Sequence, residues 1–400
     1  MKLSHHNVRF FLVSLIFLIL LPLSGCWSSK EIESLGLVAG TAMDLEKGEG
    51  IGGELEQEDS YPNRDLFIIT NQFVTSETTG TGTKGGSSQQ KAYKNVSETG
   101  DAILPTLRNM ILRIDKRAFA EHSKVIVIGE DLARTLNLQQ ILDFFLREME
   151  IRPSGFILIA KNRASITLES KEPKDIPAYQ LVEIIQGHKR TTKILPPMTL
   201  AKLEGKLHSG SSFLLQNVIS ANGKNKFAGA AVIEGKTKRL RGFLNEQELQ
   251  GLTWITGKGK GGLVESIDEE TGQPIIYEVL KMKSKIIPYV DGDSISFNIK
   301  IESEGRIAEN WIISEEAFKN EFLKRAEKAA ENKVERLVKN VLEKIQQEYK
   351  VDVSGFGNKL RIEYPYVWEK VKKDWDQTFS KVPIKYEVKL TIKDYGTVGN

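Results

Sequence analysis

The sequence predicts an α/β (α+β) protein of three domains, with mixed sheets covered by helices. Apolar runs of strand length alternate with amphipathic stretches in the N-terminal half, and a hairpin followed by a long amphipathic stretch occupies the C-terminal third. The 400 residues are 40% hydrophobic and 27% charged, which excludes a mostly disordered chain or a polytopic membrane protein. The formal net charge of +3 argues against nucleic acid as the main partner.

Residues 1–25 have the pattern of a lipoprotein signal peptide. Lys2 and Arg9 precede an apolar run over residues 10–21, which is too short for a transmembrane helix of ~20 residues. The run ends in Leu-Ser-Gly-Cys, which resembles a bacterial lipobox and contains the chain's only cysteine, Cys26. The alternative is a small-residue cleavage site with an incidental cysteine. From the lipobox we expect cleavage before Cys26 and a diacylglyceryl group on its sulfur. The two acyl chains of that group are enough for stable anchoring to a membrane.

The next part of the chain predicts an N-terminal α/β domain over residues 26–190. Short apolar runs indicate buried strands, at residues 36–43, 66–74, 125–128 and 156–160. Apolar residues at helical spacing indicate helices, at residues 102–114, 131–136, 138–149 and 177–186. The segment 75–97 is rich in Thr, Gly, Ser and Gln and is expected to be a mobile loop.

A middle domain is expected over residues 191–270. Residues 230–233 and 240–244 predict a hairpin around a Glu-Gly-Lys turn. A helix should follow, because Asn245 and Glu248 have the spacing of a capping box, and the glycine-rich segment 257–262 should end that helix.

Residues 271–400 predict a C-terminal α+β domain with an antiparallel sheet covered by a long helix. Alternating apolar residues on both sides of the turn at 291–293 predict a hairpin with one apolar face, formed by Leu280, Met282 and Ile286 and by Ile295, Phe297, Ile299 and Ile301. Ser314 should start a helix over 315–349, with an apolar stripe that runs from Phe318 to Ile345 in steps of three and four residues. Another helix should follow Pro365, and residues 382–392 predict a half-buried strand. The second face of the sheet is rich in Lys; a solvated face is the favoured interpretation, and contact with anionic lipid is the alternative.

The residues predict no catalytic, cofactor-binding or metal site. A single Cys and the scattered His122, His188 and His208 do not match metal-ligand spacing. The two Gly-x-Gly-x-x-Gly matches, at 48–53 and 257–262, lack a following helix, which a dinucleotide site needs. A catalytic pair of carboxylates stays open, since Asp and Glu are plentiful.

Several segments together resemble the Ger(x)C family, the lipoprotein C subunits of nutrient germinant receptors in endospore-forming bacteria. They span nearly the whole chain, at residues 23–27 (LSGCW), 121–134 (EHSKVIVIGEDLAR), 142–152 (LDFFLREMEIR), 229–233 (GAAVI), 241–258 (RGFLNEQELQGLTWITGK) and 352–357 (DVSGFG), with Pro365, Trp368 and Trp375. The segment 75–97 matches no motif of that family.

The resemblance implies a lipoprotein on the outer face of the spore inner membrane, in complex with two integral membrane subunits, A and B. Nutrients such as amino acids or sugars trigger such a complex, which leads to release of ions and dipicolinate. The family has a three-domain α/β fold, and the resemblance implies neither enzymatic activity nor a cofactor.

Two other functions remain open from the residues alone: a solute-binding lipoprotein of a transporter, and a cell-wall hydrolase that needs only carboxylates. The large apolar residues of segment 241–258 are expected to be core. For the receptor function, polar residues within this segment are the candidate contacts with a partner subunit, namely Arg241, Asn245, Glu246 and Glu248.

Overall fold

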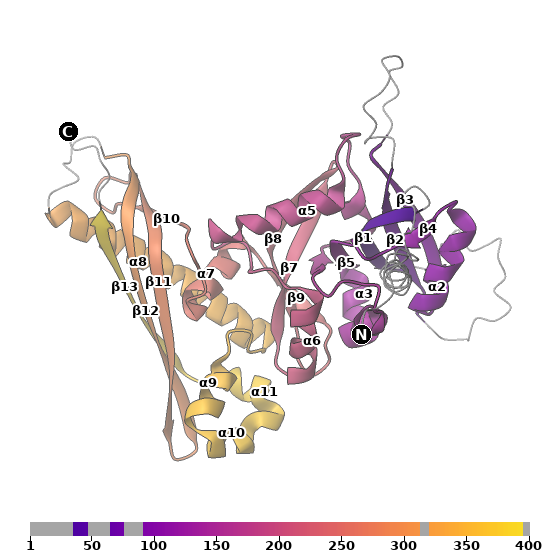
Figure 1. Ribbon diagram of the computed structural model, residues 1–400. Coiled ribbons are helices and arrows are strands. Elements are labelled where there is room, and N and C mark those ends of the chain that lie inside the picture. Colours follow the sequence, from indigo (N-terminus) through magenta and orange to yellow (C-terminus); the bar gives the residue numbers. More distant parts are fainter. Residues whose placement is uncertain (1–34, 47–64, 76–90, 313–319, 395–400) are drawn as a thin grey trace, which may run out of the picture.

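The chain folds into two β-sheets with helices packed against both (Figure 1). The computed structural model describes residues 35–46, 65–75, 91–312 and 320–394. The predicted α/β fold class is confirmed. The signal peptide and Cys26 lie outside the described residues, as do the glycine motif at 48–53 and the helix start at Ser314.

The first sheet has nine strands in the order β3-β2-β1-β5-β6-β7-β8-β9, with β4 paired to β1. The strands are β1 (Leu35–Leu45), β2 (Phe67–Val74), β3 (Tyr93–Gly100), β4 (Arg117–Phe119), β5 (Val125–Gly129), β6 (Phe156–Ala160), β7 (Phe213–Ala221), β8 (Lys224–Ile233) and β9 (Leu240–Leu244). The pairs β1–β5, β5–β6, β6–β7 and β1–β4 are parallel, and the pairs β1–β2, β2–β3, β7–β8 and β8–β9 are antiparallel.

Helices cover both faces of the first sheet. They are α2 (Ile103–Asn109), the short 3₁₀ helix η5 (Met110–Arg113), α3 (Glu130–Thr135), α4 (Leu138–Arg147), α5 (Pro177–Gln186) and α6 (Leu200–Ser209). On β5, Ile126 and Ile128 pack in the core under α4 and α6, whereas Val125 and Val127 pack in the core under α5. This strand is therefore buried on both faces, as its continuous apolar run predicts.

The second sheet has the order β10-β11-β12-β13. Its strands are β10 (Leu263–Ile267), β11 (Pro274–Asp291), β12 (Ser294–Asn310) and β13 (Ile384–Asp394). The predicted hairpin is β11–β12. The sheet is not wholly antiparallel as predicted, because β13 pairs parallel to β12. A parallel neighbour needs a crossover connection, and the helices between β12 and β13 supply it.

One long helix, α8 (Asn320–Glu343), lies along the second sheet and continues as a π-helical turn over Lys344–Tyr349. Its predicted apolar stripe is buried wherever it is described, at Phe322, Ala326, Ala330, Val334, Leu337, Val341 and Ile345. Helix α7 (Glu246–Thr256) contacts α8 and β11 as well as β8 and β9, so it joins the two sheets. Three short helices complete this half, α9 (Phe356–Glu363), α10 (Pro365–Val371) and α11 (Trp375–Phe379).

Two differences from the predicted elements have physical reasons. Residues 93–97 of the expected loop belong to β3, an edge strand whose polar side chains are satisfied by tertiary contacts such as Asn95 Nδ2 to Leu168 O at 2.8 Å. Leu280 is 53% exposed, because a bulge between Val279 and Lys281 shifts the alternation by one residue.

Helix α6 and strand β7 have no counterpart among the predicted elements. Strand β7 carries Gln216 and Asn217 in its interior, which interrupt the apolar pattern. Both amides are buried and hydrogen-bonded to backbone, Gln216 Nε2 to Gly229 O at 2.7 Å and Asn217 Nδ2 to Ala228 O at 2.9 Å. The carbonyl groups that accept from these amides lie on β8, outside the β7 segment. The residues of β7 alone therefore did not show that its two amides could be buried in a strand.

The division into domains at residues 190 and 270 stays a prediction. The first sheet runs through residue 190 without interruption, since β6 pairs with β7. The β8–β9 hairpin of the expected middle domain forms the edge of that sheet, while α7 packs against α8.

Candidate functional site

The four predicted contact residues lie together at the corner where β9 leads into α7. Arg241 is on β9, Asn245 is the N-cap of α7, and Glu246 and Glu248 are in its first turn. Arg241 and Asn245 are exposed, and the two glutamates are partly exposed.

The predicted capping box is confirmed at this corner. Asn245 Oδ1 accepts hydrogen bonds from the backbone N–H groups of Gln247 and Glu248, both at 2.9 Å. Glu248 Oε2 accepts from the Asn245 N–H at 2.7 Å. Both side chains therefore satisfy the first turn of α7.

Tyr349 ties this corner to the end of the long helix. Its hydroxyl donates to Phe243 O at 2.7 Å, and Arg241 Nε donates to Tyr349 O at 3.2 Å. Burial raises the pKa of the Tyr349 phenol, so it remains a donor at neutral pH. A Cβ on Gly242 would lie 2.5 Å from the Tyr349 ring, so only glycine permits this approach. These two hydrogen bonds form a clamp between Tyr349 and β9. The clamp also covers the edge of the first sheet, which would otherwise present unpaired backbone groups.

Glu246 forms an ion pair with Lys226 of β8 at 2.5 Å. The two side chains are 31% and 65% exposed, and ion pairs this exposed contribute ~1 kcal/mol or less. All four residues thus have a local structural role, and their contact with a partner stays a prediction.

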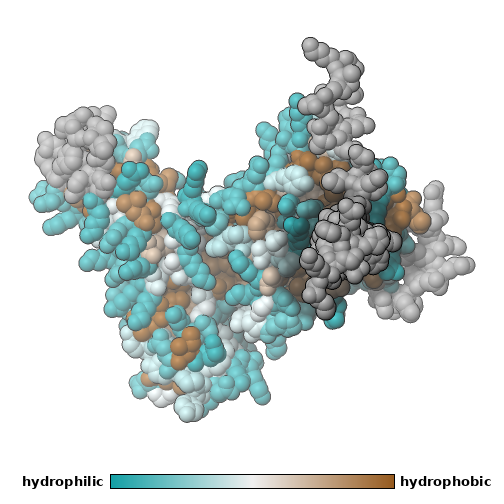
Figure 2. All heavy atoms as spheres, viewed as in Figure 1, coloured by the Kyte–Doolittle hydropathy of each residue, from teal (hydrophilic) through white to brown (hydrophobic). Residues whose placement is uncertain are grey.

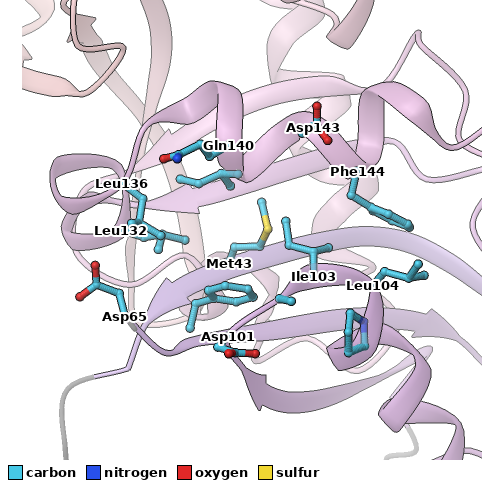
Figure 3. Close-up of a pocket in the computed structure, with 14 residues that line it drawn as sticks. Met43, Asp65, Asp101, Ile103, Leu104, Leu132, Leu136, Gln140, Asp143 and Phe144 are labelled. Atoms are coloured by element: carbon cyan, nitrogen blue, oxygen red, sulfur yellow. The ribbon is translucent and has the colours of Figure 1, made fainter. Parts of the chain in front are cut away.

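A cavity of about 580 Å³ opens on the first sheet among β1, β2, α2, α3 and α4 (Figure 3). Met43, Phe67, Leu132 and Ile141 are buried and form an apolar floor. Figure 3 shows Asp65 and Asp101 at one side and Gln140 and Asp143 on α4 at the other.

The charged side chains that line this cavity are acidic. The described residues that line it include three aspartates and neither Lys nor Arg. Arg147 lies nearby and pairs with Asp143 at 2.8 Å. The volume is in the range of small-molecule sites, but a carboxylate ligand would meet like charge. The cavity therefore suits an apolar group that carries a cation or hydroxyls.

A buried ion pair holds the β10–β11 turn on α8. The side chain of Asp268 is fully buried; it accepts from Arg325 Nε at 2.8 Å and from Thr271 N and Oγ1 at 2.9 and 2.8 Å. Burial alone would raise the pKa of Asp268, but the hydrogen bonds from Arg325 and Thr271 outweigh it and lower that pKa. The sequence signal was the Asp-x-x-Thr spacing of a side-chain-closed turn.

We expect Asp268→Asn to lower the free energy of unfolding at pH 7 by ~1.5–3 kcal/mol, the contribution of hydrogen bonds to charged groups. Since the folded-state pKa of Asp268 is lowered, its contribution is complete above the unfolded-state pKa and is lost as pH falls through the folded-state pKa. Denaturant unfolding of both proteins between pH 7 and pH 3 should show the difference shrinking in acid. Glu270→Gln, at a 64% exposed partner of the same arginine, is the control and should change little; a pH-independent difference at Asp268 would contradict the assignment.

A second buried carboxylate, Asp352, organises the C-terminal helices. Its Oδ1 accepts from the N–H groups of Ser354, Gly355 and Phe356 at 2.8–3.2 Å, and its Oδ2 accepts from Gly357 N at 2.7 Å and Trp375 Nε1 at 2.9 Å. Asp376 accepts from the Asp352 N–H at 3.0 Å, and burial together with the charge of Asp352 raises the pKa of Asp376. The two carboxylates are close, but Asp352 is engaged in backbone bonds, so the pair organises the fold.

The Lys-rich face of the second sheet is mixed in charge. Lys281 and Lys283 lie opposite Glu304 and Glu302 on β12, and Lys389 lies opposite Glu302 from the other side. Opposite charges across neighbouring strands stabilise a sheet. This register favours the interpretation of a solvated face.

The described residues also bear on the remaining motifs. Gly257 caps the end of α7, and β10 rather than a helix follows the glycines at 257–262. Within the described ranges, no group of three or more His, Cys, Asp or Glu side chains is placed to hold a metal ion. None of the described helices is long and apolar enough to cross a membrane.

Two family models match most of the chain. The model "Spore germination protein N-terminal domain" matches residues 28–219, and "Spore germination B3/ GerAC like, C-terminal" matches residues 228–396. The boundary between the two matches falls at the β7–β8 hairpin, inside the first sheet.

Individual proteins of Bacillus subtilis (strain 168) match over nearly their full length. The chain is 47% identical to "Spore germination protein YndF" over 96% of both chains, and 31% identical to "Spore germination protein B3" over 96% of this chain and 98% of that protein. The crystal structure of the GerBC protein superposes with a TM-score of 0.60 at 27% identity, and the match covers 89% of this chain and 98% of that one.

Proposed function

This chain belongs to the GerAC-like, or Ger(x)C, family of spore germination proteins, and from that premise we propose that it is the lipid-anchored C subunit of a nutrient germinant receptor. The observation that carries the proposal is the match to "Spore germination protein YndF" over 96% of both chains. A match of that extent includes both sheets, α7 and the C-terminal helices, so no large part of the relative is missing.

The anchor follows from the lipobox at Cys26. Acylation there would hold the subunit to the outer face of the spore inner membrane, beside the integral membrane A and B subunits. The mature chain would act through protein contacts, without catalysis or a cofactor. The corner at Arg241 and Glu246 is the proposed contact surface, because these two charged side chains lie at least partly at the surface of a rigid, capped and clamped segment.

Purification from detergent-solubilised spore membranes tests the proposal. A chain with a C-terminal affinity tag should carry a diacylglyceryl-modified Cys26 at its N-terminus, detectable by mass spectrometry, and should bring two integral membrane proteins with it. An unmodified N-terminus would contradict the anchor, and a chain that purifies alone after crosslinking would contradict the complex.

Charge reversal tests the contact surface. Arg241→Glu and Glu246→Lys should each lower the free energy of unfolding by no more than ~2 kcal/mol, because one removes a hydrogen bond to Tyr349 O and the other a partly exposed ion pair with Lys226, yet lower recovery of the integral subunits and slow germination. Glu363→Lys, at an exposed position of α9, is the charge-matched control and should leave both unchanged. Normal recovery and germination with both variants would show that this corner is structural only.

The cavity in Figure 3 is the observation that favours the second candidate, a solute-binding lipoprotein. Its lining disfavours ligands whose carboxylate would lie against the aspartates, although Asp143 is paired with Arg147. Thermal shift of the mature chain with the candidate nutrients separates the two functions, since a ligand that binds only the folded state must raise its stability. A concentration-dependent increase would favour solute binding by this chain.

A further inference from the structure

Three large apolar side chains are exposed on the segments that follow α2 and α4. Ile111 is 59% exposed, Leu112 is 87% exposed and Met149 is 97% exposed. Single exposed apolar residues are common, whereas a group of them indicates a contact surface. Figure 2 shows hydrophobic surface at the right of that view, in the region of α2.

The first two residues are held outward by a rigid support. They belong to η5, where the preceding Met110 is 1% exposed and packs in the core under α4. Asn71 Nδ2 donates to Met110 Sδ at 3.5 Å, and Arg113 pairs with Glu98 of β3 at 2.5 Å. Met110 and Arg113 are the two ends of η5, and both are held to the sheet. Ile111 and Leu112 between them are therefore exposed on a fixed part of the backbone.

Arg117 connects this group to the start of the sheet. It lies opposite Leu35, the first residue of β1, in the β1–β4 pair. Its guanidinium pairs with Glu150 at 3.5 Å, which brings the adjacent Met149 to the same region. Leu112 precedes Arg117 by only five positions in the chain, a span of at most ~18 Å.

The proposed anchor also reaches this region. Cys26 precedes Leu35 by nine positions, and a fully extended chain covers ~3.3–3.6 Å per residue, or about 30 Å in all. The start of β1 must therefore lie within about 30 Å of the bilayer surface if Cys26 is acylated. Arg113, Lys116 and Arg117 are neighbours of these apolar side chains in the sequence, and so are Asp115, Glu148 and Glu150, while Arg113 and Arg117 are paired with Glu98 and Glu150. Insertion into a lipid headgroup layer would therefore depend on apolar contact rather than on a positive charge.

We propose that Ile111, Leu112 and Met149 form a bilayer-contact surface, which inserts into the headgroup layer beside the acylated Cys26. This inference rests on the proposed lipid anchor and adds an orientation to it. Acyl chains alone tether a protein but leave it free to rotate; a second contact at the start of β1 fixes which side of the first sheet faces the membrane and its integral proteins.

Single-cysteine labelling tests the surface in the lipidated, full-length processed protein. Cys26 is the only cysteine and would be blocked by acylation, so Leu112→Cys and Met149→Cys each introduce one reactive thiol. The proteins are labelled with a polarity-sensitive fluorophore and reconstituted in vesicles of phosphatidylglycerol and phosphatidylethanolamine that contain spin-labelled phosphatidylcholine. Both labels should show blue-shifted emission and quenching by the spin-labelled lipid.

Tyr366→Cys is the matched control, because Tyr366 is 87% exposed on α10, among the C-terminal helices. Its label should remain unshifted and unquenched. Labels at 112 and 149 that behave like the label at 366, in protein that co-sediments with the vesicles, would overturn the contact surface and leave the anchor standing. Failure to co-sediment would overturn the anchor and this inference together. Shielding at 112 and 149 that appears only with integral subunits present would identify a protein interface and also overturn it.

Discussion

Trp254→Ala is expected to lower the free energy of unfolding by ~3–5 kcal/mol, the usual cost of the cavity left by a large buried aromatic side chain. Trp254 is fully buried in the core that combines α7, α8 and the second sheet. Because α7 contacts both sheets, a cavity there should loosen the junction between them. Denaturant unfolding followed by far-UV circular dichroism measures the loss.

Two further tryptophan variants make the test specific. Trp254→Phe should cost much less than alanine, since the indole Nε1 has no hydrogen-bond partner among the described residues and the phenyl ring refills most of the volume. Trp311→Ala, at a side chain that is 56% exposed, should stay within ~0.5 kcal/mol of the parent protein. Equal losses for Trp254→Ala and Trp311→Ala would contradict the assignment of Trp254 to the core.

Asp352→Ala is the second change with a large expected effect, a loss of at least ~3 kcal/mol. The substitution leaves four backbone N–H groups and the Trp375 indole N–H without their acceptor, and a buried donor left unpaired costs ~1–3 kcal/mol. The C-terminal helices should separate from one another. The near-UV circular dichroism signal of the aromatic cluster around Trp375 should therefore weaken, and the midpoint of unfolding should fall.

Asp374→Ala is the control for this prediction, because Asp374 is an exposed aspartate one position before Trp375. It should leave stability nearly unchanged. Asp352→Asn should fall between the two, since one side-chain oxygen still accepts while the amide faces donors. A stability loss for Asp352→Ala no larger than for Asp374→Ala would show that water replaces the carboxylate without cost.

Structural features that depend on residues close together in the chain could be predicted from the sequence. The capping box at Asn245 and Glu248, the stripe along α8 and the buried run of β5 depend on spacings of two to four residues, and all three occur as predicted. The large apolar residues of α7, expected to be core, are buried at Leu249, Leu252, Trp254 and Ile255. Strands β7 and β3 were not predicted, because polar residues inside them interrupt the apolar pattern.

Some candidate functional features are local in the sequence, and others are built from segments that are far apart in the chain. The lipobox at Cys26 is a local motif, and the candidate contacts at Arg241 and Glu246 are neighbours in the chain. The cavity beneath α2 and α4 and the exposed group at Leu112 and Met149 are each built from segments distant in sequence, so no spacing rule identifies them.

By itself, the sequence determined the α/β class, most helices and strands, the expected anchor and the family resemblance, because each of these depends on local patterns, either in one segment or in several segments taken in order. Only the tertiary structure decided the order of the nine strands, the parallel pairing of β13 with β12, the clamp of Tyr349 on β9 and the two buried carboxylates Asp268 and Asp352. The physical reason is that such contacts join residues far apart in the chain. Their partners are selected by packing and by the need to satisfy buried polar groups, and neither leaves a periodic trace in the residues that take part.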